Sequence, residues 1–185
     1  MKIALFGKMR SGKDSVGEIL IREHNFKRFA FGDGIGEIIA KYFPEDMSNG
    51  KPRKHYQLIG QELRKLNKDV WVNYLLKKVW ESGRSCRISG KEFNVVVTDG
   101  RQVNEAERLK QEGFLIVKVV CPEEQRIERM KKLGDVFTPE QLQHETELQV
   151  DKIKADIEII NDGTIEELMI KVQKLVSEYR GKFNG

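Results

Sequence analysis

The chain of 185 residues has the length of one domain, long enough to bury roughly 70% of its unfolded surface. Hydrophobic residues make up 39% and charged residues 34%, and the mean hydropathy is -0.53, which excludes a disordered chain and an integral membrane protein. No apolar run approaches the roughly 18 residues of a membrane span. The apolar run at the start is too short for a signal peptide, so we expect a cytoplasmic protein without a membrane partner.

Positive charge is concentrated in the first part of the chain. Residues 1–100 hold 19 Lys and Arg against 12 Asp and Glu, whereas residues 101–185 hold 14 against 17. The basic part predicts an anionic partner, either a nucleic acid or a phosphorylated small molecule. The two cysteines, Cys86 and Cys121, have no C-x-x-C spacing, so neither a zinc site nor a disulfide framework is predicted.

Apolar runs alternate with helical patterns along the chain. In chain order, the predicted elements are strand 2–6, helix 15–22, strand 27–31, a helix capped by Asp33 and stopped by Pro44, helices 56–66 and 70–80, strand 94–98, helix 104–112, strand 115–120, helices 122–132 and 140–148, strand 157–160, and a helix from its cap Thr164 to Tyr179. Segments 44–54 and 83–93 are predicted as loops, the second of them as a loop or small hairpin. Strands that alternate with helices predict a parallel sheet with right-handed crossovers in a single α/β domain.

A glycine-containing segment, residues 7–15, lies between the first strand and the first helix, where a phosphate-binding loop belongs. In such a loop, backbone N–H groups point at phosphate oxygens, and Lys13 can reach the β- and γ-phosphates. The alternative is an ordinary strand-to-helix turn with a solvated lysine.

Two acids are candidate magnesium ligands. Asp14 follows the loop after the first strand, and Asp99 follows strand 94–98 directly. Asp14 stands where the loop pattern has Ser or Thr, and the hydroxyl comes one residue later at Ser15, which we expect to bond a phosphate that is not transferred. Asp99, just after strand 94–98, is the second candidate, and Arg101 suits an acceptor phosphate because guanidinium binds phosphate bidentately. The alternative for Asp14 is an acid in the first helical turn that the helix dipole favours, and the alternative for Asp99 and Arg101 is a capping turn.

Two arginines, Arg126 and Arg129, lie three residues apart on a charged helix that is followed by a glycine-containing break and another polar helix. This arrangement, about residues 122–148, suits a closing lid whose cations surround a migrating phosphoryl group. The alternative is a solvent-facing helix laced by ion pairs.

Five further residues are candidates for an acceptor pocket, with aromatic rings to stack on a base and charges for a sugar or phosphate. They are Phe31, Asp33, Arg64, Asp69 and Trp71. Taken one by one, each is more typical of a core aromatic, a helix cap or a surface charge.

Four segments together resemble the phage-type deoxynucleoside monophosphate kinases, a branch of the P-loop NMP-kinase-like fold, and the resemblance covers nearly the whole chain. They are residues 10–15, 67–73, 97–101 with 104–107, and 161–168. The resemblance implies a three-layer fold with a five-stranded parallel sheet in the order 2-3-1-4-5, helices on both faces and a helical lid. It also implies ATP as donor, Mg²⁺, and a deoxynucleoside 5′-monophosphate as acceptor.

The resemblance also assigns roles to individual residues and segments. The acceptor-binding helices are expected over about 33–82, and residues 161–164 are expected near the adenine. The assigned ATP-binding residues are Gly7, Arg10, Ser11, Gly12, Lys13, Asp14, Ser15, Asn161 and Gly163; the acceptor residues are Phe31, Asp33, Arg64, Trp71 and Arg101; the metal ligands are Asp14 and Asp99; and the catalytic residues are Lys13, Arg126 and Arg129. Gly36 departs from the family pattern, which has a lysine at this place.

Other functions share parts of this pattern. Phosphomevalonate kinases of the animal type have the Ser-Gly-Lys-Asp loop, and dephospho-coenzyme A kinases have the general architecture. A DNA-stimulated P-loop ATPase would use the basic part of the chain, but a single domain leaves little room for a nucleic-acid module. The sequence therefore predicts nucleotide substrates and no stable nucleic-acid partner, and it leaves a homodimer open.

Overall fold

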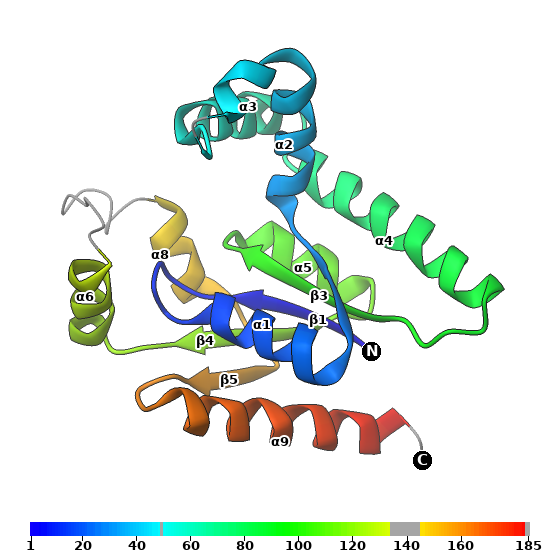
Figure 1. The fold of residues 1–185 in the computed structure, drawn as a ribbon, viewed down its shortest axis with the longest axis vertical. Coiled ribbons are helices and arrows are strands. Elements are labelled where there is room, and N and C mark those ends of the chain that lie inside the picture. The colour runs from blue at the N-terminus through cyan, green and yellow to red at the C-terminus, as the bar shows by residue number, and fades with distance from the viewer. Residues whose placement is uncertain (49, 134–144, 184–185) are drawn as a thin grey trace. The chain divides into compact units, whose positions relative to one another are not determined.

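The computed structural model describes residues 1–48, 50–133 and 145–183, and it contains a five-stranded parallel sheet (Figure 1). The strands are β1 (Lys2–Phe6), β2 (Phe26–Phe29), β3 (Asn94–Gly100), β4 (Leu115–Val120) and β5 (Ile157–Ile160). Their order is β2-β3-β1-β4-β5, which confirms the predicted order and fold class.

The helices follow the predicted pattern with shifted ends. They are α1 (Lys13–His24), α2 (Phe31–Tyr42), α3 (Arg53–Leu66), α4 (Val70–Ile88), α5 (Val103–Gln111), α6 (Glu123–Lys132), α8 (Glu145–Lys152) and α9 (Ile165–Phe183), with a 3₁₀ turn at Pro44–Met47. Residues 140–144 of the predicted helix 140–148 lie outside the described residues. Thr164 caps α9 as predicted, because its Oγ1 accepts the N–H of Glu167 at 3.3 Å.

Two local predictions are wrong. The segment 83–93 was predicted as a loop, but α4 continues to Ile88 because Gly83 serves as a packing contact: a Cβ atom there would lie 2.9 Å from the Phe93 ring. Asp33 was predicted to cap its helix, but α2 begins two residues earlier. Asp33 lies in the first turn, and its carboxylate accepts the N–H of Ala30 at 3.0 Å.

The chain divides into two compact units. The first is Met1–Arg28 with Asn94–Gly185, and it contains most of the sheet. The second, Phe29–Phe93, holds α2, α3 and α4 and is inserted between β2 and β3. It includes the whole segment predicted to bind the acceptor, about residues 33–82.

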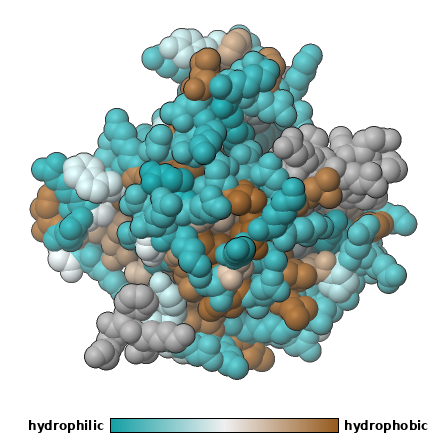
Figure 2. Space-filling view, turned by 180° about the vertical axis from the view of Figure 1, so that it is seen from behind, coloured by the Kyte–Doolittle hydropathy of each residue, from teal (hydrophilic) through white to brown (hydrophobic). Residues whose placement is uncertain are grey.

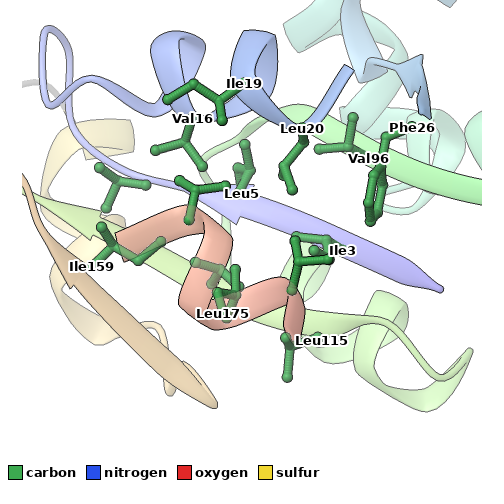
Figure 3. Packing of buried hydrophobic residues seen from close by; sticks show 14 of the residues in the cluster. Ile3, Leu5, Val16, Ile19, Leu20, Phe26, Val96, Leu115, Ile159 and Leu175 are labelled. Carbon is green, nitrogen blue, oxygen red and sulfur yellow. The ribbon is translucent and has the colours of Figure 1, made fainter. Parts of the chain in front are cut away.

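In the first unit, α1 and α9 pack on one face of the sheet, and α5 and α8 lie on the other (Figure 1). Figure 3 shows the apolar cluster between β1, α1 and α9, in which Ile3 and Leu5 face Val16 and Leu20. The neighbouring β1 residues are buried as well, so this strand is covered on both faces, as its continuous apolar run predicts. The strands thereby hold the start of α1 rigidly at one edge of the sheet.

Polar side chains predominate on the face seen in Figure 2, and apolar ones form smaller groups between them. Within the part of the chain that the structure describes, no helix is both long enough and apolar enough to cross a membrane.

Replacement of Gly100 by alanine is expected to destabilise the first unit. An added Cβ atom would lie 2.5 to 2.7 Å from three carbons of the Phe6 ring, which is fully buried and cannot move aside. Overpacking of this kind costs about 1–3 kcal/mol. Urea unfolding of Gly100→Ala checks this. The double variant with Phe6→Leu should lose less stability than the sum of the two single variants, and strict additivity would contradict the proposed clash.

Candidate functional site

The loop between β1 and α1 is tightly curled, and Gly12 at its end has a backbone that favours glycine. Gly12 has φ of 93°, and a Cβ atom there would lie 1.9 Å from Nδ2 of Asn161. The N–H of Ser11 donates to the carbonyl oxygen of Lys8 at 3.1 Å, which closes the curl. The loop therefore leads directly into the N-terminus of α1, where backbone N–H groups have no partner within the helix.

Lys13, the first residue of α1, is buried. Its side chain is 6% exposed, and its Nζ lies 3.7 Å from Oδ1 of Asp14, whose own side chain is 80% exposed. The alternative of a solvated lysine is therefore wrong. A buried ammonium group at a helix N-terminus concentrates positive charge at the loop, which favours an anionic ligand.

Two carbonyl oxygens of the loop accept hydrogen bonds from the residue that follows β5 and from α6. Nδ2 of Asn161 donates to the carbonyl oxygen of Ser11 at 2.9 Å. Arg129 donates from Nη1 to the carbonyl oxygen of Arg10 at 3.5 Å and from Nη2 to that of Asn161 at 3.3 Å. The amide of Asn161, predicted to lie near the adenine, thus contacts the phosphate-binding loop itself.

Helix α6 turns one face inward and the other outward. Arg126 is 4% exposed, and Arg129 is half-buried. On the outer face, Lys132 pairs with Glu128 at 2.7 Å. The alternative of a solvent-facing helix therefore describes only the outer face. Both arginines also lie near Cys121: burial raises the pKa of this thiol, and the charges of Arg129 and Arg126 oppose that rise.

The end of β3 carries Asp99 at an irregularity of the sheet. Ala4 pairs with Val97 but Phe6 pairs with Gly100, so β3 has one residue more than β1 in this interval. Such bulges reorient side chains at the ends of strands. Within residues 1–48, 50–133 and 145–183, no group of three or more His, Cys, Asp or Glu side chains is placed to hold a metal ion.

Asp14 and Asp99 lie at the same edge of the sheet. Helix α1 approaches β3 so closely at Gly17 that a Cβ atom there would lie 2.9 Å from Cγ2 of Thr98. Asp14 is one helical turn before Gly17, and Asp99 directly follows Thr98. Mg²⁺ at a phosphate site is bound through one or two carboxylates, substrate phosphates and water, so these two acids suit it chemically.

Glu105 positions the turn that carries Arg101, a role that the sequence reasoning missed. Its buried Oε2 accepts the N–H groups of Arg101 and Gln102, each at 3.0 Å. The signal was present in the sequence as the spacing Gln-x-x-Glu at the start of a helix, which is typical of a capping box. The turn after β3 is thereby fixed, and Arg101 with it.

The other predicted acceptor residues lie in the second unit. Trp71 is buried and donates from Nε1 to the carbonyl oxygen of Gly60 at 3.1 Å, and Arg64 donates from Nη1 to the same oxygen at 3.2 Å. Phe31 is also buried, whereas Asp33 is exposed. The structure thus brings Trp71 and Arg64 together at Gly60. The shared role of these residues and Arg101 in binding one acceptor stays a prediction.

Residues 3–147 match the family model described as an AAA domain. The chain belongs to the AAA domain family. No curated protein matches the chain. Gly12 and Lys13 lie between the first strand and the first helix, which is the position of a phosphate-binding loop.

Solved structures resemble the whole chain. Shikimate kinase from Aquifex aeolicus is 22% identical with a TM-score of 0.55, and the match covers 100% of this chain and 99% of that one. Dephospho-CoA kinase from Campylobacter jejuni is 16% identical with a TM-score of 0.56, covering 98% and 100%. A gluconokinase from Sinorhizobium meliloti is 19% identical with a TM-score of 0.54, covering 98% and 96%. At these identities, the likeness shows the fold, which is a P-loop kinase-like α/β fold.

Proposed function

We propose that the chain is an ATP-dependent kinase that converts a deoxynucleoside 5′-monophosphate to the diphosphate. The observation that supports ATP as donor is the buried Lys13 at the start of α1, in a loop whose Ser11 carbonyl oxygen accepts a bond from Asn161. The acceptor class rests on the resemblance of the four sequence segments named above. The hydroxyl of Ser11 adds support, since its Oγ is buried and makes no hydrogen bond with any described residue. A bound phosphate satisfies such orphaned donors.

In the proposed reaction, an oxygen of the acceptor phosphate attacks the γ-phosphorus of ATP, the bond to the bridging β–γ oxygen breaks, and ADP leaves. The loop residues Gly7, Arg10, Ser11, Gly12 and Ser15 and the ammonium of Lys13 orient the ATP phosphates. Arg126 and Arg129 supply positive charge where the phosphoryl group moves.

Asp14 and Asp99 are the proposed holders of Mg²⁺, which when bound neutralises part of the phosphate charge. Asn161 and Gly163 stay assigned to the ATP side. For the acceptor, we retain five residues as proposed ligands. They are Phe31, Asp33, Arg64, Trp71 and Arg101.

A second candidate is a kinase of another small metabolite. The solved structures that share the fold are kinases of shikimate, of dephospho-CoA and of gluconate. Gly36 favours this candidate, because the lysine of the nucleotide branch is missing and a Cβ atom at this position would lie 2.6 Å from the hydroxyl of Tyr56. The space beside residue 36 is thus taken by a neutral hydroxyl group.

An assay of ADP release distinguishes the candidates. The purified chain is supplied with ATP and Mg²⁺ and, one at a time, with the common deoxynucleoside monophosphates, ribonucleoside monophosphates, phosphomevalonate, dephospho-CoA, shikimate and gluconate. Release that depends on a deoxynucleoside monophosphate supports the proposal, and release with another acceptor selects the second candidate. Release stimulated by DNA alone would instead indicate an ATPase and overturn both.

Replacing Asp14 by asparagine is expected to raise the magnesium concentration needed for half-maximal rate by about 10-fold. A neutral amide is a poorer ligand for a hard cation than a carboxylate. Asp99→Asn should act in the same direction. The matched control is Glu18→Gln, which removes an exposed negative charge one turn further along α1. Identical magnesium titrations for the wild type and both Asn variants would contradict magnesium binding by Asp14 and Asp99 and leave them with structural roles in a helix cap and a turn.

A further inference from the structure

Three polar groups of Asn161 make hydrogen bonds that join four segments of the first unit. Its side-chain Nδ2 donates to the carbonyl oxygen of Ser11 at 2.9 Å, and its backbone N–H donates to that of Val120 at 2.7 Å. Its own carbonyl oxygen accepts from Nη2 of Arg129 at 3.3 Å. The residue is 6% exposed, so the side chain is held in one place between β4, α6 and the loop.

The bond to Ser11 also orients the next N–H group. The carbonyl group of Ser11 and the N–H group of Gly12 belong to one peptide unit, which is planar and trans, so the two groups point in opposite directions. When the carbonyl oxygen is directed at Asn161, the N–H of Gly12 is directed to the other side of the loop. A row of N–H groups on that side is what an anion requires.

Glycine by itself does not fix the orientation of this peptide unit, because it adopts positive and negative φ with similar ease. A rotated Ser11–Gly12 unit would present a carbonyl oxygen to the phosphates and repel them. The amide of Asn161 occupies the space where a side chain at position 12 would begin, since a Cβ atom there would lie 1.9 Å from Nδ2. Because Gly12 has no side chain, the amide of Asn161 can come close enough to bond the Ser11–Gly12 peptide.

We propose that Asn161 is a positioning residue of the phosphate-binding loop, which holds the Ser11–Gly12 peptide so that its N–H faces the phosphates. The role concerns phosphate groups and is independent of the base or acceptor. It rests on the proposed function in that the loop binds the phosphates of ATP.

The test is the binding of inorganic tripolyphosphate and of ATP to the full chain, measured by calorimetry. Asn161→Ala should weaken both ligands by about 10- to 100-fold, as the loss of a buried hydrogen bond requires. In steady-state kinetics, the KM for ATP should rise and the KM for the acceptor should stay unchanged. The amide signal of Gly12 in a ¹⁵N spectrum should shift with tripolyphosphate in the wild type and not in the variant.

Lys171→Met is the matched control. Lys171 donates from Nζ to the carbonyl oxygen of Ile160 at 2.6 Å, so it anchors the same turn from α9 without contacting the loop. Its loss should leave tripolyphosphate binding unchanged. If Asn161→Ala does not fold, Asn161→Leu replaces it, because this variant has a similar shape, lacks the donor and adds no charge beside the phosphates.

The possible failures are distinguishable. If the wild type binds neither tripolyphosphate nor ATP, the loop is no phosphate site and both proposals fall. If the wild type binds both and the Asn161 variants bind them equally well, only the positioning role is overturned. If Lys171→Met weakens tripolyphosphate binding as much as Asn161→Ala does, the effect comes from the stability of the turn, and the positioning role of Asn161 is also overturned.

Discussion

Lys13→Met is expected to lower kcat by about 10³-fold while the protein stays folded. The ammonium group is buried at the phosphate-binding loop, where water screens its charge poorly, so its loss removes a strong interaction with the moving phosphoryl group. Methionine has nearly the same length and no charge. The carboxylate of Asp14, which pairs with Lys13, is 80% exposed and stays solvated when the ammonium is lost, so the free energy of unfolding should change little.

Steady-state kinetics and urea unfolding check the two parts of this prediction. Lys8→Met is the matched control, because Lys8 lies in the same loop but is more exposed and pairs with Asp151 at 2.7 Å. Surface pairs of this kind contribute at most about 1 kcal/mol, so the control should keep its turnover within a few-fold. Wild-type turnover in a folded Lys13→Met variant would remove Lys13 from the mechanism.

The second large effect is expected at α6, where Arg126→Ala and Arg129→Ala should each lower kcat by about 10²–10⁴-fold. The structure predicts a difference between them. Arg129 bonds the carbonyl oxygens of Arg10 and Asn161, so its loss should also weaken ATP binding. Arg126 is buried on the inward face of α6, and we expect its loss to fall mainly on kcat.

Kinetics of both variants, with ATP affinity from calorimetry, separate these effects. Lys131→Ala is the control, since it removes an exposed cation from the same helix. Near-normal kcat in both arginine variants would make α6 a structural helix and contradict the closing lid predicted from the sequence for about residues 122–148, of which 134–144 lie outside the described residues.

The ends of several strands and the position of the phosphate-binding loop could be predicted from local sequence alone. The apolar runs of β1 and β4 could be predicted with the observed ends, because a strand buried on both faces is apolar along most of its length. The ends of β5 were also predicted, although Ile159 is its only buried residue. The loop before α1 could be predicted because its glycines and lysine serve a backbone function within a few residues. The order of the strands came from the resemblance, since periodicity alone does not say which strands are neighbours.

Only the tertiary structure decided how distant residues meet. The bond from Asn161 to the Ser11 carbonyl joins positions 150 residues apart, and nothing in either local sequence indicates the other. The length of α4 was missed for the same reason, because Gly83 is a helix breaker by propensity and becomes a packing contact only when Phe93 lies against it. The burial of Lys13 likewise depends on the surrounding elements. Propensity and pattern act over a few residues, whereas burial and hydrogen bonding depend on what the fold brings near.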